Sequence, residues 1–115
     1  MVTHNEIDPN GKSPKEPGAK LDAGKPPLYR GVLDYFPRAL RAIALVSQAG
    51  ARKYAWKGWE TVPDGIPRYS DALVRHLTDE SIQFLDDDTG QPHSAQVAWN
   101  ALARLELILK ERESK

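Results

Sequence analysis

The sequence predicts an all-α fold: a small bundle of three main helices with long ordered loops, completed by oligomerisation. Apolar residues recur at helical spacing in three stretches, and no alternation of apolar and polar residues persists long enough for a strand. The third stretch carries apolar residues on an arc wider than one intramolecular contact needs, which favours a dimer or tetramer. The residues of this arc are Trp99, Leu102, Leu105 and Leu109.

The N-terminal part of the chain divides into a tail and a strap. Residues 1–17 combine Pro and Gly with few large apolar side chains, so they are expected to form a flexible tail. Residues 18–115 are expected to form a single helical domain. That domain begins with an irregular strap, whose Leu, Tyr and Phe side chains let it lie on the body of the protein.

Start and stop signals delimit the three helices. Pro37 suits the first turn of a helix, and Pro92 suits the start of another. Between the first two helices, Gly, Pro, Trp and Tyr residues predict a long aromatic loop, of a length that is usually functional when it is ordered. We expect helices over residues 36–48 with room for one more turn, from Arg68 or Ser70 to about Leu85, and from about Pro92 past Leu109.

The composition limits the classes of function. Lys plus Arg and Asp plus Glu both number 16, and this zero net charge argues against membrane association and direct nucleic-acid binding. The absence of cysteine excludes disulfides, thiolate zinc sites and cysteine nucleophiles. Without an apolar signal region or a stretch long enough to span a bilayer, the chain is expected to be a soluble cytoplasmic protein.

A carboxylate is expected to point inward from the second helix. At about 100° per residue, Glu80 falls on the stripe made by Leu73, Leu77 and Phe84. Burying an unpaired carboxylate is costly, so Glu80 needs a cation or a metal as its partner. His76 lies one turn earlier on the same side, and Asp79 and Gln83 flank it.

The third helix repeats this polar edge. His93, Gln96, Asn100 and Arg104 fall within roughly 80° of one another at helical pitch. Two such helices packed face to face would enclose a polar pocket within an apolar bundle. The alternative is that these polar side chains only bond one another or a helix end.

Two groups of cations could bind a nucleotide. Lys20, Asp22 and Lys25 form a K-x-D-x-G-K pattern that suits a polyphosphate, although lysines in such a segment are often only solvated. Lys53 precedes Tyr54 in the aromatic loop, and Trp59 follows, so these rings could stack on a base. The alternative for the rings is ordinary packing over the bundle.

Four segments resemble a known family when they are taken in order. They are GAKLDAGKPPL, GARKYAWKGW, RYSDALVRHL and DDDTGQPHSAQVAWNALARLE. Over residues 18–109 the chain resembles the phage and prophage dATP/dGTP diphosphohydrolase domain, which is related to the MazG-like all-α nucleoside triphosphate pyrophosphohydrolases. The resemblance implies a helical oligomer that cleaves dATP or dGTP to the monophosphate and pyrophosphate with a divalent metal. A phage-encoded enzyme of this kind would adjust the nucleotide pool of the host-cell cytoplasm.

The resemblance also implies which residues form the site, with two departures. Gln96 stands where the family often has a second His, and Ile82-Gln83 stands where it has a Gly-Glu pair. The matching positions are Lys20, Asp22, Lys25, Lys53, Tyr54, Trp59, Arg75, His76, Asp86, Gly90, His93 and Asn100.

These features combine into one expected mechanism. Glu80, with Asp79 and Asp86, would bind Mg²⁺ or Mn²⁺, and an activated water would attack the α-phosphate. His76 and His93 would orient or deprotonate that water, or ligate manganese directly. The other residues would bind substrate: Lys20, Lys25 and Lys53 the pyrophosphate, Tyr54 or Trp59 the base, and Asn100 a purine edge or a ligand carboxylate.

Two alternatives stay open at this point. The Asp86-Asp87-Asp88 run is typical of a solvated turn, and only Asp86 is nominated as functional. The competing function is a noncatalytic helical module that binds a nucleotide or a protein. That function accounts for the wide apolar arc of the third helix, but it does not account for an inward carboxylate.

Overall fold

The computed structural model describes residues 6–115, which divide between Phe36 and Pro37 into an N-terminal unit and a helical unit. The N-terminal unit consists of turns and one short π-helix, η1 (Tyr29–Leu33), within the expected strap. Asp8 is buried there, and its carboxylate accepts hydrogen bonds from the backbone nitrogens of Asn10 and Lys20 at 2.8 and 3.2 Å. Of the expected flexible tail, residues 1–5 lie outside the described residues.

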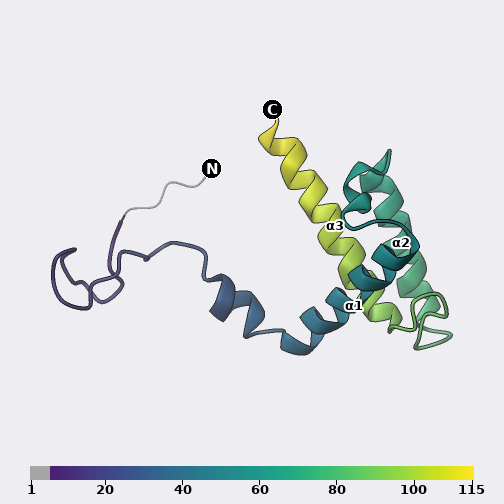
Figure 1. Ribbon diagram of the computed structural model, residues 1–115, viewed down its shortest axis with the longest axis horizontal. Coiled ribbons are helices and arrows are strands. Elements are labelled where there is room, and N and C mark those ends of the chain that lie inside the picture. The colour runs from purple at the N-terminus through teal and green to yellow at the C-terminus, as the bar shows by residue number, and fades with distance from the viewer. Residues whose placement is uncertain (1–5) are drawn as a thin grey trace. The chain divides into compact units, whose positions relative to one another are not determined.

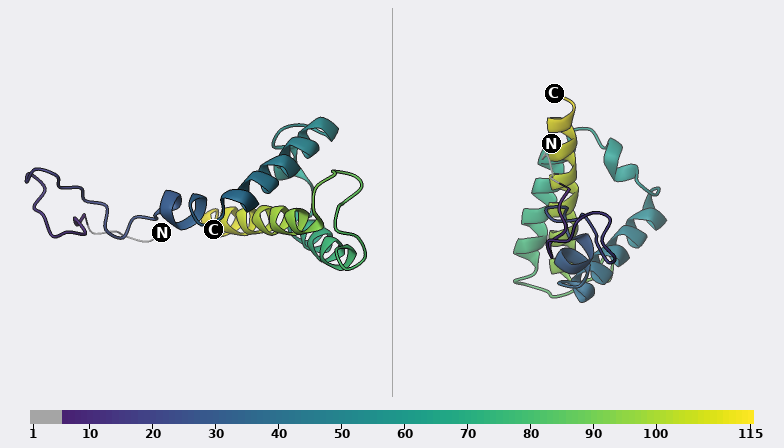
Figure 2. Two further views of the ribbon diagram at one scale, coloured as in Figure 1. Left: turned by 90° about the horizontal axis from the view of Figure 1, so that it is seen from below. Right: turned by 90° about the vertical axis from the view of Figure 1, so that its left-hand side faces the viewer.

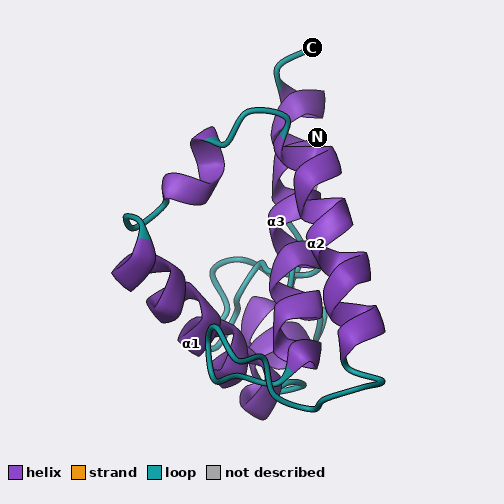
Figure 3. Ribbon diagram, turned by 90° about the vertical axis from the view of Figure 1, so that its right-hand side faces the viewer, coloured by secondary structure: helices purple, strands orange, loops and turns teal. Residues whose placement is uncertain are grey.

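The helical unit confirms the all-α prediction, because the part of the chain that the structure describes contains no strand. Its helices are α1 (Pro37–Lys53), α2 (Gly65–Asp79) and α3 (His93–Glu113), with a short 3-10 helix, η2 (Gly58–Thr61), in the aromatic loop. Figures 1 and 3 show these helices and the loops that join them. Within residues 6–115, no helix is both long enough and apolar enough to cross a membrane.

The two later helices pack side by side and antiparallel, and α1 crosses α3 at an angle (Figures 1 and 2). Gly65 at the start of α2 allows a close approach, because a Cβ there would lie 2.8 Å from the Leu107 side chain. Arg104 of α3 donates a 2.7 Å hydrogen bond to the Ser70 hydroxyl of α2. Among residues 6–115, the buried apolar residues are small: Val46, Ala95 and Ala103.

An aromatic cluster joins the aromatic loop to the helices. The rings of Trp59, Tyr69 and Trp99 meet edge to face, with centroids 5.7 to 6.2 Å apart. The Tyr69 hydroxyl donates to the Trp59 carbonyl at 2.7 Å, and the Trp99 indole nitrogen donates to the Ser47 hydroxyl of α1 at 2.9 Å. The loop is therefore fixed to α2 and α3 by three contacting rings, of which Tyr69 and Trp99 also use their polar atoms in hydrogen bonds.

The predicted extent of the second helix is wrong, since α2 ends at Asp79 and not near Leu85. Beyond it, the bonds from Ser81 and Ile82 reach back three residues, which is typical of a fraying helix end. Phe84 is 69% exposed and Leu77 is 51% exposed, so the stripe that was expected to surround Glu80 is not a core. Glu80 itself is the C-cap and keeps helical dihedral angles, with its nitrogen donating to the His76 carbonyl at 3.0 Å, so the helical phase is lost only after it.

Candidate metal centre

The loop between α2 and α3 folds back on itself through backbone hydrogen bonds. The His93 nitrogen donates to the Phe84 carbonyl at 3.0 Å, and the Asp86 nitrogen donates to the Gln91 carbonyl at 2.8 Å. The Gly90 nitrogen donates to the Asp86 carbonyl at 2.8 Å and so closes the turn. Gly90 has a φ of 73°, a left-handed conformation that favours glycine. These bonds place Asp86 next to the first turn of α3.

Two histidines meet at the end of the helix pair. His76 lies on the last turn of α2 and His93 is the first residue of α3, and their Nδ1 atoms are 2.9 Å apart. At this separation one nitrogen donates and the other accepts, so at least one ring is neutral. Burial lowers the pKa of His76, and the charges of Arg75 and His93 act in the same direction, whereas Asp86 and Asp79 oppose them.

Asp86 completes a cluster that can hold a metal ion. A nitrogen of His76, a nitrogen of His93 and a carboxylate oxygen of Asp86 all lie within 4.8 Å of one another. Two imidazole nitrogens bound at right angles to one ion, at about 2.1 Å each, would lie about 3 Å apart, close to the separation of this pair. The donor set of two nitrogens and one oxygen therefore fits a divalent transition metal.

Hydrogen bonds converge on one oxygen of Asp86. Its Oδ2 accepts from the Thr89 hydroxyl at 2.9 Å, from the Thr89 backbone nitrogen at 3.3 Å and from the Gln96 amide at 3.4 Å. The Gln96 amide also donates to the Thr89 hydroxyl at 2.7 Å. Sequence reasoning missed Thr89, although an Asp followed three residues later by Thr is a recognisable turn signal.

A polar hollow of about 210 Å³ adjoins this cluster. It is smaller than the roughly 300–1,000 Å³ of a typical ligand pocket, so it has room for part of a substrate and its cation. The hollow places a further carboxylate, that of Asp79, beside the cluster. Its lining consists of Asp79, Ile82, Gln83, Asp86, Asp87 and His93.

Glu80 lies outside the cluster. It follows the last residue of α2, it is partly exposed, and its Oε1 accepts a hydrogen bond from the Ser94 hydroxyl. The expectation that Glu80 is aimed at an apolar core is therefore wrong. Its observed contact ties the end of α2 to the first turn of α3.

The other two aspartates of the turn bind surface partners. Asp87 accepts from the Gln83 amide at 2.7 Å, and Asp88 pairs with the Lys53 ammonium at 3.0 Å. Both side chains of the Lys53 pair are more than half exposed, and the hydrogen bond that Lys53 donates to Asp88 raises the pKa of Lys53. The structure thus ties the end of α1 to the turn that carries Asp86.

The remaining predicted substrate residues belong to both units of the chain. Arg75 and Tyr54 are exposed, and Asn100 is buried, with its amide donating to the Gln96 carbonyl within α3 at 2.8 Å. Lys20, Asp22 and Lys25 belong to the N-terminal unit, in which the Lys25 nitrogen bonds the Asp22 carbonyl at 3.1 Å.

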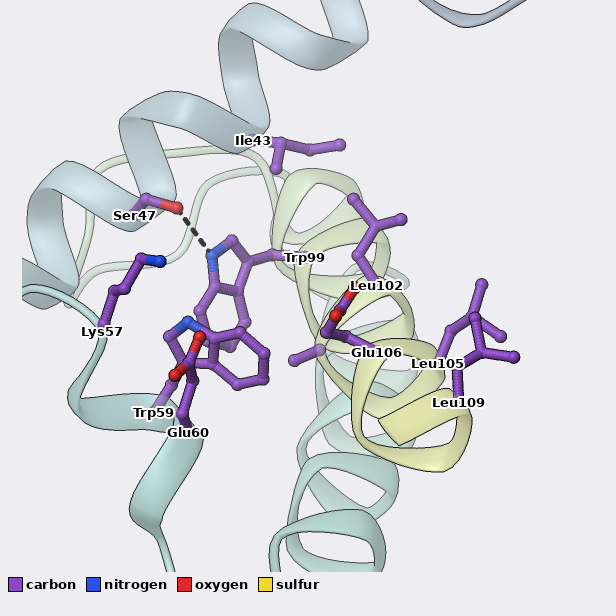
Figure 4. A pocket seen from close by; sticks show the side chains of 11 residues that line it. Ile43, Ser47, Lys57, Trp59, Glu60, Trp99, Leu102, Leu105, Glu106 and Leu109 are labelled. Atoms are coloured by element: carbon purple, nitrogen blue, oxygen red, sulfur yellow. Dashed lines mark hydrogen bonds between the residues drawn. The ribbon is translucent and has the colours of Figure 1, made fainter. Parts of the chain in front are cut away.

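Trp59 lines a second, apolar groove of about 500 Å³ that shares no lining residue with the polar hollow. Figure 4 shows Trp59 beside Trp99, whose indole bonds Ser47, while Leu105 and Leu109 project from the other side of α3. Those two leucines are half exposed. All four residues of the wide apolar arc that the sequence predicts line this groove.

A family model described as dATP/dGTP diphosphohydrolase, N-terminal, matches residues 15–115. No curated protein matches the chain. No solved structure matches it either.

Proposed function

Because the chain belongs to the dATP/dGTP diphosphohydrolase N-terminal family, we propose that it hydrolyses dATP or dGTP to the monophosphate and pyrophosphate with a divalent metal held by His76, Asp86 and His93. The convergence of these three side chains is the observation that carries the proposal. Water adds to the α-phosphorus in this reaction, and the bond to the bridging oxygen of the pyrophosphate breaks.

The metal would supply charge neutralisation at the phosphate oxygens and a lowered pKa for the attacking water. The donor set favours Mn²⁺ over Mg²⁺, because Mg²⁺ prefers oxygen ligands and imidazole nitrogen suits softer ions. Of the two cofactors expected from the sequence, manganese is therefore the better candidate.

The residues around the cluster would handle the proton. A lowered pKa keeps His76 neutral near pH 7, so that a ring nitrogen can bind a cation or accept a proton. Asp79 lines the same hollow as His93 and Asp86 and is the residue that we propose to receive the proton from the attacking water. Asp86 takes the place of Glu80 as the main carboxylate ligand in this proposal.

Substrate binding would extend outward from the cluster. Lys53 is paired with Asp88 in the same turn and would turn toward the departing pyrophosphate. Arg75 would provide a further cation, and for Lys20, Asp22 and Lys25, which belong to the N-terminal unit, a role in substrate binding is supported by the family resemblance alone. For the base, an exposed ring such as Tyr54 is better placed to stack than Trp59, whose ring already contacts two others.

The test is a nucleotide panel with the full chain. Purified protein is incubated with each of the four deoxynucleoside triphosphates and Mn²⁺ or Mg²⁺, and monophosphate and pyrophosphate are quantified. We expect release from dATP or dGTP with Mn²⁺, and a loss of at least about 100-fold in the His76→Gln, His93→Gln double variant, because both nitrogen ligands are gone. Release that is unchanged in the double variant would place the chemistry elsewhere.

The competing function is a noncatalytic nucleotide- or protein-binding module, and the apolar groove at Trp59 and Trp99 favours it. A folded wild-type protein that binds Mn²⁺ and dGTP but releases no pyrophosphate would support the module and contradict the hydrolase.

A further inference from the structure

The cluster contains a hydrogen-bond network that the proposed chemistry does not use directly. Thr89 and Gln96 both donate to one oxygen of Asp86, and Gln96 also donates to Thr89. Gln96 is buried, with 6% of its surface exposed. The buried Gln96 amide therefore contacts the carboxylate of the candidate metal centre.

The network distinguishes the two oxygens of the Asp86 carboxylate. Oδ2 accepts three hydrogen bonds, two from Thr89 and one from Gln96. No hydrogen bond found within residues 6–115 reaches Oδ1. Because three donors converge on Oδ2, rotation of the carboxylate would break several bonds at once, and Oδ1 is left with its lone pairs available.

The network is not required to close the loop. Three backbone bonds, from His93 to Phe84, from Asp86 to Gln91 and from Gly90 to Asp86, already reverse the chain. Removing the Thr89 hydroxyl would free the Asp86 carboxylate and the Gln91 nitrogen, which donates to that hydroxyl at 3.2 Å, while the three backbone bonds remain to hold the turn.

We infer that Thr89 and Gln96 are positioning residues: they hold the Asp86 carboxylate so that a single oxygen faces the divalent cation beside His76 and His93. This inference rests on the proposed function only in assuming that the cluster binds a metal. Partners of this kind orient ligands, and their loss typically costs about 10–100-fold in metal affinity. The network would thereby make Asp86 a ligand through one oxygen, and the positions that His76 and His93 do not occupy would be left to water and phosphate.

A matched pair of substitutions at one position tests the inference. Thr89→Val keeps the shape of the side chain and removes its hydroxyl, whereas Thr89→Ser keeps the hydroxyl and removes a methyl group. Mn²⁺ binding is measured on the full chain by electron paramagnetic resonance, because bound Mn²⁺ loses the sharp signal of the free ion. We expect Thr89→Val to raise the dissociation constant about 10-fold or more, and Thr89→Ser to stay within about threefold of the wild type.

A second variant extends the test to the amide. Gln96→Met keeps the length of the side chain and removes both polar atoms, so we expect its dissociation constant to rise about 10-fold as well. Thermal unfolding of the metal-free variants is recorded in parallel. A merely structural role would lower the unfolding temperature of Thr89→Val while its Mn²⁺ affinity stayed at the wild-type value, and that result would overturn the inference.

The outcomes separate this inference from the proposed function. Tight Mn²⁺ binding that weakens in Thr89→Val, without any pyrophosphate release by the wild type, would support the positioning role and contradict the hydrolase. Pyrophosphate release by the wild type, together with equal Mn²⁺ affinity in the wild type and Thr89→Val, would support the hydrolase and contradict the positioning role. If the wild type binds no Mn²⁺ at all, both proposals fail.

Discussion

Replacing Asp86 by Asn is the sharpest test of the metal centre, because it changes one atom of the cluster. Asp86 Oδ2 accepts three hydrogen bonds, and the amide oxygen of an asparagine can accept the same three. If it does, an NH₂ group replaces the second oxygen. That group donates and has no lone pair for a cation, so the shape of the site survives while its third ligand is lost.

The magnitudes follow from these contacts. Loss of an outer-shell partner costs about 10–100-fold in metal affinity, so loss of the ligand itself should cost more than about 100-fold, or about 2.8 kcal/mol. The effect on folding should be smaller. The hydrogen bonds to Oδ2 change from charge-assisted to neutral, which we expect to lower the free energy of unfolding of the metal-free protein by about 1 kcal/mol.

Glu80→Gln is the matched control, since it makes the same carboxylate-to-amide change a few residues away. Glu80 contacts the Ser94 hydroxyl and is not in the cluster. The Mn²⁺ affinity of the Glu80→Gln variant should therefore stay within about threefold of the wild-type value. Mn²⁺ titration and pyrophosphate release are measured for both variants. If Glu80→Gln abolished metal binding and Asp86→Asn preserved it, the assignment of the site to the turn would be refuted.

Three further predictions concern stability and assembly. Burial lowers the pKa of His76 from 6.5, so as the pH falls the unfolded chain binds a proton at this site before the folded protein does. The free energy of unfolding therefore decreases as the pH drops below about 6.5 toward the pKa of the folded protein. The difference between the free energies of unfolding in urea at about pH 7.5 and about pH 5.5 should be smaller for His76→Asn than for the wild type. Tyr69→Phe removes the bond to the Trp59 carbonyl and should cost about 1 kcal/mol, seen as a drop of several degrees in Tm. The half-exposed leucines of α3 predict that the protein self-associates through that face, so Leu105→Glu should lower the molecular mass measured by light scattering. The control is Ile82→Glu, which places the same charge on a side chain that is 83% exposed in the loop after α2. This variant should keep the mass of the wild type.

The helices could be predicted from the sequence because their evidence is local. Apolar spacing and a proline in the first turn identified α1, and the possible extra turn is present up to Lys53. The start of α3 next to Pro92 was predicted in the same way. The end of α2 was not, since no Gly or Pro marks it and the apolar spacing continues through Phe84.

The same limit explains which site residues could be found. His76 and His93 lie within regular helix, so their phase was predictable, and the structure brings their rings together. Glu80 keeps the helical phase as the C-cap of α2, but the Leu77 and Phe84 side chains on its stripe are exposed, so the phase does not point it into a core. Thr89 was missed because its role depends on the turn closing on Asp86, which is a property of the folded loop and not of helical spacing.

The turn also shows why three adjacent aspartates have different roles. Asp87 and Asp88 are exposed and bind Gln83 and Lys53, as expected for a solvated turn. Asp86 differs because Thr89 follows it by three residues and bonds its carboxylate, while its own backbone nitrogen is tied to Gln91. A carboxylate held in this way next to two histidines loses little entropy when a cation binds. The turn should therefore contribute to metal affinity through Asp86, although it contributes little to the apolar core.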